Sequence, residues 1–160
     1  MYAHRYITEI EYVVVQKCPA GDERVVPIDQ HDYLEWVEEG GVPIIEAAGR
    51  FLSVINGQLV IDPNKEQILL NEKKKSLIDA IQRRLDEEAQ THNYDGILSA
   101  CTYALSTKTK FAKEGKACVA WRDEVWTKGY EIMAEVEAGT RPIPTEEELI
   151  QELPIMNWQG

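Results

Sequence analysis

The chain has 160 residues, 44% of them hydrophobic and 28% charged, which is enough to form one compact domain or two small ones. Its 17 basic and 28 acidic residues give a net charge of -11, so the positive surface that binds phosphates is missing and nucleic acid is not expected as a partner. Its apolar runs are too short for a signal peptide or a membrane span, so we expect a cytoplasmic protein without a membrane partner. Its three cysteines are widely spaced and form no C-x-x-C pair, so we expect neither disulfides nor a zinc site.

The first segment has the pattern of a small sheet. Apolar and polar residues alternate from Tyr6 to Val14, which predicts a half-buried strand. Residues 19–22 predict a turn, and Arg24 to Val26 predicts a second strand that pairs with the first. Farther on, Asn56-Gly57 separates two apolar runs and favours a type I′ hairpin.

One short helix is expected within this sheet unit. Asp29 is a suitable N-cap, four apolar residues follow at helical spacing, and Gly40-Gly41 favours a left-handed end. Residues 1–62 together carry 4 basic and 11 acidic residues, a net charge of -7. We interpret residues 1–62 as a small β-rich attachment unit.

Residues 63–139 have the pattern of a helical bundle. Asp62-Pro63 favours the start of a long helix that continues to residue 91, with a possible break near Asn71. A second helix is expected over residues 97–105 and a third over residues 109–137. The third helix presents apolar residues and two glycines at three- and four-residue spacing, and we expect its inner face to include Phe111, Gly115, Cys118, Val119, Arg122, Val125, Trp126, Gly129, Ile132, Met133 and Val136.

Residues 140–160 are predicted to form an extended tail with a short helix. Arg141-Pro142-Ile143-Pro144 favours extended backbone, Thr145 and Glu148 have the spacing of a capping box, and Pro154 stops the helix. The expected fold class is α+β: a small N-terminal antiparallel sheet with one short helix, followed by a long helix and a C-terminal three-helix bundle.

The pattern of polar residues does not favour catalysis. His4, His31 and His92 fall in three different elements, and none has a histidine or cysteine at the spacing of a helical metal pair. Acidic runs such as Asp86-Glu87-Glu88 are typical of solvated faces rather than of an acid/base pair held in a cleft. We therefore expect no enzyme activity, no metal and no cofactor.

The partner-binding candidates are Trp36, Trp121, Arg122 and Trp158. Tryptophan and arginine supply much of the binding energy at protein interfaces, and Trp121 and Trp158 are favoured for contacts with another chain, whereas Trp126 is expected in the core. Arg122 falls on an otherwise apolar helix face. It therefore requires a partner such as Asp95 or Glu87, or it extends to water.

Two sequence blocks resemble proteins of bacteriophage tails. Residues 32–43, DYLEWVEEGGVP, are similar to the Y-L-x-W-x-x-x-G-x-x-P segment of many tail-fibre and tail-fibre-assembly proteins. The second block resembles a C-terminal module of phage tail proteins, and it comprises residues 93–104, residues 111–115, Trp121-Arg122-Asp123, Trp126 and residues 139–145. The two blocks lie within residues 32–145 of the chain.

The resemblance implies a non-enzymatic, tail-associated protein that binds a tail-fibre or baseplate subunit, located in the virion tail and in the host cytoplasm during assembly. It implies no catalytic residues. A structural virion component and an assembly chaperone that dissociates before particle completion both fit, and homo-oligomerisation is possible. The acidic composition also permits an acidic decoy that inhibits a host nucleic-acid-binding enzyme, and an enzyme of unfamiliar design is the third alternative.

Overall fold

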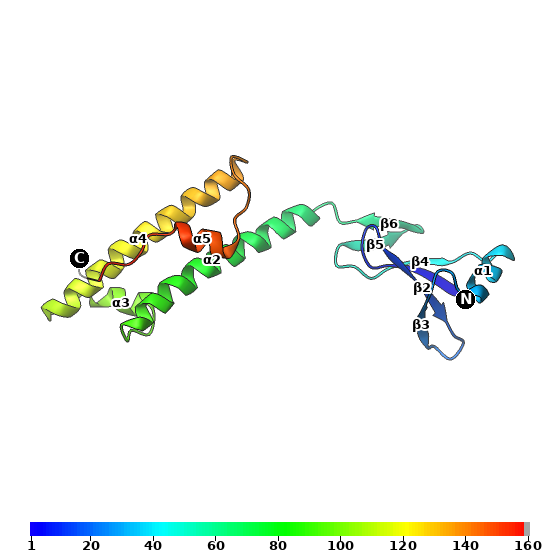
Figure 1. The fold of residues 1–160 in the computed structure, drawn as a ribbon, viewed down its shortest axis with the longest axis horizontal. Coiled ribbons are helices and arrows are strands. Elements are labelled where there is room, and N and C mark those ends of the chain that lie inside the picture. Colours follow the sequence, from blue (N-terminus) through cyan, green and yellow to red (C-terminus); the bar gives the residue numbers. More distant parts are fainter. Residues whose placement is uncertain (159–160) are drawn as a thin grey trace. The chain divides into compact units, whose positions relative to one another are not determined.

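The computed structural model describes residues 1–158 and divides into two compact units, the first comprising residues 1–68 and the second beginning at Leu69. The expected α+β class is confirmed, with a sheet first and helices after it (Figure 1). The first unit contains β1 (Tyr2–Tyr6), β2 (Tyr12–Lys17), β3 (Glu23–Val26), α1 (His31–Glu38), β4 (Ile44–Ala47), β5 (Leu52–Ile55) and β6 (Gln58–Ile61). Then follow α2 (Lys65–Thr91), α3 (Ile97–Thr102), the 3₁₀ helix η1 (Tyr103–Leu105), α4 (Thr109–Glu137) and α5 (Glu146–Glu152).

The main sheet has the strand order β3-β2-β1-β4. Its β1–β2 and β2–β3 pairs are antiparallel, but β4 returns through α1 and pairs parallel to β1, so the sheet is mixed rather than purely antiparallel. The pairing of His4 with Val14, and of Val14 with Val26, places these three residues on one face. Ala3 and Arg5 therefore lie on the other face.

The prediction of one strand from Tyr6 to Val14 was wrong, because the chain turns in the middle of that segment. The Thr8 hydroxyl accepts hydrogen bonds from the backbone N–H groups of Ile10 and Glu11, and the N–H of Ile7 donates to the Glu11 carbonyl. A threonine side chain that satisfies nearby backbone groups competes with strand pairing. The alternation therefore belongs to the facing ends of β1 and β2.

The two predicted turn elements of this unit have different outcomes. Asn56 and Gly57 have φ values of 52° and 74° and connect β5 to β6, which confirms the type I′ hairpin. Helix α1 does form, but Gln30 rather than Asp29 is its N-cap, and no side chain caps its first turn. The helix is instead held by its contacts with the sheet.

The core of the first unit is a small aromatic cluster between α1 and the sheet. Tyr2, Val14 and Val26 on the strands are buried against Tyr33, with Trp36 packed beside them. The rings of Tyr2 and Tyr33 meet edge to face, with centroids 5.1 Å apart. This contact fixes which face of the sheet α1 covers.

Helix α2 is continuous from Lys65 to Thr91, so no break occurs at Asn71. It starts two residues later than predicted. The Asp62 carboxylate accepts from the N–H of Asn64, and Pro63 lies in the turn before the helix rather than at its first position. Asp62 does satisfy a backbone donor, but through an Asx turn and not as the N-cap of the helix.

Short α3 is attached closely to its two long neighbours. The Asp86 carboxylate on α2 accepts from the N–H of Ile97 at 2.8 Å and so caps α3, whose own N-cap residue is Gly96. The 3₁₀ helix η1, which follows α3 directly, contacts α4 at Gly115. A Cβ added to Gly115 would be 2.2 Å from the Ala104 nitrogen of η1. The glycine thus permits the close approach expected from its place on the inner face.

Helix α4 has the predicted bounds and ends as predicted. Gly139 has a φ of 70°, the left-handed conformation that follows many helices. The capping box of α5 is also present: the Thr145 hydroxyl accepts from the N–H of Glu148, whose carboxylate accepts from the N–H of Thr145. Pro154 follows two residues after the helix.

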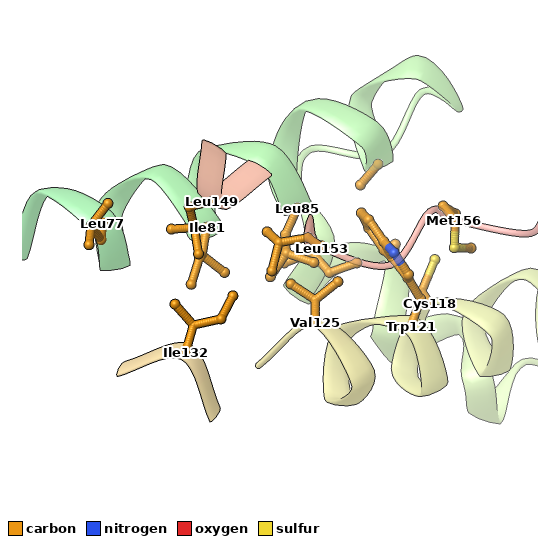
Figure 2. Packing of buried hydrophobic residues seen from close by; sticks show 13 residues of the cluster. Leu77, Ile81, Leu85, Cys118, Trp121, Val125, Ile132, Leu149, Leu153 and Met156 are labelled. Atoms are coloured by element: carbon orange, nitrogen blue, oxygen red, sulfur yellow. The ribbon is translucent and has the colours of Figure 1, made fainter. Parts of the chain in front are cut away.

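The core of the second unit combines α2, α4 and the C-terminal segment. Figure 2 shows Leu77, Ile81 and Leu85 of α2 opposite Val125 and Ile132 of α4. The tail expected over residues 140–160 contributes three buried side chains to this same core, namely Leu149, Leu153 and Met156, and residues 159–160 lie outside the described part. In the described residues, no helix has the length and apolar character needed to span a membrane.

Candidate partner-binding surfaces

Trp121 belongs to the core and not to an exposed surface. It is only 4% exposed, and its indole Nε1–H donates to the Pro154 carbonyl at 2.8 Å. The prediction that Trp121 favours contact with another chain does not fit this burial, because its side chain is already covered by the C-terminal segment. Helical periodicity placed it next to the inner face but could not show that residues after α5 would cover it.

Arg122 also differs from its expected environment. The guanidinium contacts Asp123 at 3.5 Å rather than Asp95 or Glu87, and the side chain is 39% exposed. Within residues 1–158, Arg122 forms no interior salt bridge. Arg122 therefore reaches the surface at the edge of the core, as a long side chain on an apolar face can.

Trp158 is half-buried and tied to α2. Its indole N–H donates to the Glu88 carboxylate at 3.0 Å, and its ring stacks on His92 with centroids 3.7 Å apart. The hydrogen bond from Trp158, with a second from Arg84, holds the pKa of Glu88 below its usual range. The N–H edge of the Trp158 ring is therefore engaged in a contact within the second unit.

Trp36 has a mainly structural environment too. It is half-buried beside Tyr2, with ring centroids 5.2 Å apart, and Gly41 packs against its indole so closely that an added Cβ would be 2.3 Å from the ring. The shape of the turn after α1 thus depends on a glycine at position 41. Trp36 belongs to the first unit and the other three candidates belong to the second.

A surface groove that sequence reasoning missed contains Arg122 together with two aromatic residues. This α4 groove is lined by Gln82 of α2, Leu98 of α3, and Arg122, Asp123, Trp126, Thr127 and Tyr130 of α4. Tyr130 is 64% exposed and Leu98 65% exposed, and the Trp126 ring contacts that of Tyr130. Tryptophan, tyrosine and arginine are the residue types that dominate binding energy at interfaces. The spacing of Arg122, Trp126 and Tyr130, four residues apart, could have revealed this groove.

The first unit has an apolar surface of its own at the ends of β2 and β3. This β2–β3 surface is lined by Ile7, Ile10, Glu11, Tyr12, Val13, Val14, Val25, Val26 and Ile28. Ile10 is 90% exposed, Val25 67% and Ile28 57%. β3 is also an edge strand of the sheet. An edge strand with exposed branched side chains can accept a strand or an apolar segment from a partner.

On the sheet face opposite α1, four charged side chains form an ion-pair network. Arg5 donates to Glu46 at 2.8 Å and to Glu23 at 2.7 Å, while Lys17 pairs with Glu46. The hydrogen bond from Lys17, aided by Arg5, lowers the pKa of Glu46. Because each carboxylate is matched by a cation, this network has no unpaired charge and does not resemble a catalytic pair.

Among residues 1–158, no group of three or more histidine, cysteine or acidic side chains is arranged to hold a metal ion. Burial raises the pKa of the Cys118 thiol to about 11, so this cysteine stays protonated. No protein-family model, curated protein or solved structure shows significant similarity to this chain.

Proposed function

We propose that the chain is a non-enzymatic phage tail-associated protein that binds a tail-fibre or baseplate subunit and remains in the virion tail as a structural component. The observation that carries this proposal is the resemblance of its two sequence blocks to phage tail proteins. In the infected cell the protein would first reside in the host cytoplasm, where tails assemble.

The structural roles of the motif residues support the use of this resemblance. Gly115 permits the contact between α4 and η1, Trp121 holds the C-terminal segment, Gly139 ends α4 and Thr145 caps α5. These residues determine the fold of the helical unit. Proteins that share them at the same spacing are therefore expected to share that unit, which makes the second block more informative than a chance match of surface residues.

The β2–β3 surface is the part of the first unit that we assign to the fibre or baseplate partner. It exposes Ile10, Val25 and Ile28 next to the unpaired edge of β3. Isolated exposed apolar residues are common, but a group of them at a sheet edge favours association with another chain. The acidic charge of residues 1–62 suggests that the partner surface is basic around an apolar centre.

Quantitative mass spectrometry of purified phage particles tests retention in the tail. A fixed ratio of this chain to the fibre subunit is expected. Absence from particles, with presence beside fibre in infected-cell lysate, would instead support the alternative function of a dissociating assembly chaperone. Absence from both would contradict a tail function altogether.

A matched pair of variants tests the binding surface. Val25→Glu places a charge on the β2–β3 surface, and Val37→Glu makes the same change on α1, where Val37 is 40% exposed. Co-purification with the fibre or baseplate subunit is expected to fall at least about tenfold for Val25→Glu, the size of effect typical of an interface anchor, and to persist for Val37→Glu. Equal binding by both variants would remove the β2–β3 surface from the proposal.

A further inference from the structure

The turn between β5 and β6 joins an asparagine to a glycine, and both residues are exposed. Asn56 and Gly57 form a two-residue loop, and the strands pair up to Ile55 and Gln58 on either side of it. A Cβ added to Gly57 would have no atom within 4 Å, so the loop is not covered at this point by another part of the described chain. The side-chain amide of Asn56 and the backbone nitrogen of Gly57 are therefore both open to water.

These two groups are the reactants of an intramolecular reaction. The backbone nitrogen of the residue after an asparagine can attack the side-chain carbonyl carbon, Cγ, and close a succinimide ring. A Cβ on the following residue hinders this attack, and glycine has none. Of the five asparagines in the chain, only Asn56 precedes a glycine; the others precede Lys65, Glu72, Tyr94 and Trp158. Asn56 is thus the asparagine of this chain at which the ring forms most easily.

The stability of the hairpin controls how often the reaction can start. The closed turn holds Asn56 in the left-handed region, with a φ of 52°, and ring closure requires its backbone to rotate out of the turn. Strands β5 and β6 form a two-stranded sheet of their own, and a single hairpin is only marginally stable in water (Figure 1). Every residue of the two strands is exposed or half-buried. We therefore expect this hairpin to open more readily than the main sheet.

We propose that Asn56 is a modification site at which the chain deamidates spontaneously, and that the isoaspartate product loosens the β5–β6 hairpin. The Gly57 nitrogen forms a bond to Cγ of Asn56, the Cγ–Nδ2 bond breaks, and Nδ2 leaves as ammonia with the proton of the Gly57 nitrogen. Water then opens the succinimide. Attack at Cγ restores the main chain and gives aspartate, whereas attack at the backbone carbonyl carbon breaks its bond to the Gly57 nitrogen and gives isoaspartate. One water is consumed and one ammonia released, so the conversion needs no oxidant.

The two products have different effects on the hairpin. Asp-Gly is one of the residue pairs preferred in a type I′ turn, so the aspartate form keeps the loop. In isoaspartate the main chain runs through the side-chain carbon Cβ, so the loop gains a backbone atom. Because loop length sets the register of a hairpin, the longer loop no longer matches the pairing of Ile55 with Gln58. The isoaspartate form therefore weakens the pairing of β5 with β6.

Incubation of the purified full chain in mildly alkaline buffer tests the site, because the attacking nitrogen must lose its proton. Peptide mapping by liquid chromatography and mass spectrometry separates the asparagine, aspartate and isoaspartate forms. Asn56 should convert at least about tenfold faster than Asn93, which corresponds to a barrier lower by about 1.4 kcal/mol. Asn93 is a matched internal control, because it too has a left-handed backbone, with a φ of 66°, but precedes Tyr94.

Two variants separate the two reactants. Asn56→Gly removes the side-chain amide and leaves Gly-Gly, which also suits the turn, so no conversion is expected at this position. Gly57→Asp retains the amide of Asn56 but adds a Cβ beside the attacking nitrogen, and aspartate tolerates the left-handed conformation. Conversion at Asn56 should then slow at least about tenfold. Unchanged conversion in Gly57→Asp would contradict attack by this nitrogen.

Hydrogen exchange measures the effect on the hairpin. The amides of residues 52–61 should exchange at least about tenfold faster in the purified isoaspartate form than in the fresh chain. Asn56→Asp, which reproduces the aspartate product alone, should keep the protection of the fresh chain. Equal loss of protection in Asn56→Asp would show that the added charge, and not the longer loop, opens the hairpin, and would overturn that part of the proposal.

The urea-unfolded chain gives the rate of conversion without the hairpin. The proposal is overturned if Asn56 stays intact in the native chain while the unfolded chain converts, or if Asn56 converts no faster than Asn93. The test needs only this chain, so its outcome is independent of the tail function. A chain that deamidates at Asn56 but does not bind fibre would contradict the proposed function and leave the modification site intact.

Discussion

The indole N–H of Trp121 on α4 donates a hydrogen bond to the carbonyl of Pro154, 33 residues farther along the chain. The bond joins the long helix to the segment that follows α5, and it buries a tryptophan that the sequence had suggested for an interface. It also satisfies the indole donor where water has little access. Both the packing of the Trp121 ring and its hydrogen bond therefore hold the C-terminal segment against α4.

Two substitutions at Trp121 separate these contributions. Trp121→Phe keeps most of the ring but removes the donor, and we expect it to lower the free energy of unfolding by about 1–2 kcal/mol. Trp121→Ala also leaves a cavity and should cost about 3–5 kcal/mol. Urea unfolding followed by circular dichroism measures both. Equal losses for the two variants would show that the hydrogen bond, and not packing, dominates.

Gly115 and Gly129 form a natural pair for a second prediction. An added Cβ at Gly115 meets backbone atoms of Tyr103 and Ala104, whereas at Gly129 it meets only the end of the Ile81 side chain at 2.7 Å. Alanine is about 1 kcal/mol better than glycine in a helix interior, so Gly129→Ala should be close to neutral once Ile81 shifts. Gly115→Ala should destabilise the protein by about 2 kcal/mol or more. Thermal unfolding of both variants checks the order.

The pH dependence of stability is predicted from Glu88. Its folded-state pKa lies below the ordinary value of 4.5 because Trp158 and Arg84 donate to its carboxylate. The resulting stabilisation is complete above pH 4.5 and is lost as the pH falls through the folded-state pKa. Glu88→Gln should therefore make the urea midpoint less dependent on pH in this acidic range. An unchanged pH profile would show that the Trp158 contact does not favour the charged carboxylate.

Cysteine reactivity reports on opening of the second core. Cys118 is fully buried, and its pKa is raised to about 11, so it should resist a thiol reagent in the native state. Cys18 in the first unit is partly exposed and should react first. Labelling of variants with one cysteine each, followed by mass spectrometry, gives the two rates. Rapid labelling of Cys118 under native conditions would contradict a closed core around α4.

The sequence predicts the elements of this protein well where the signal is local. The bounds of α4, the Thr145 capping box and the Asn56-Gly57 hairpin all depend on residues within a few positions of one another. The prediction from sequence is wrong where a competing local contact or a distant segment determines the conformation. Thr8 turns the chain within an apparent strand, and the parallel pairing of β4 depends on a crossover that no periodicity encodes.

The candidate surfaces show the same division. An amphipathic pattern identifies which residues of α4 lie near the core, but Trp121 and Trp126 differ by only five positions, and their relative burial depends on what covers each side. The segment after Pro154 covers Trp121, while nothing in the described residues fully covers Trp126. Trp126 packs partly against the core as expected, but the deeper burial of Trp121 depends on tertiary contacts that the pattern does not contain.

The position of Leu149, Leu153 and Met156 in the core has a consequence for biosynthesis. These side chains are synthesised after both long helices. Until they emerge, part of the apolar surface of α2 and α4 stays uncovered. During translation this surface is open to aggregation or to binding by cellular chaperones. The helical unit therefore completes its packing only after the segment that contains Leu149, Leu153 and Met156 has followed α4 out of the ribosome.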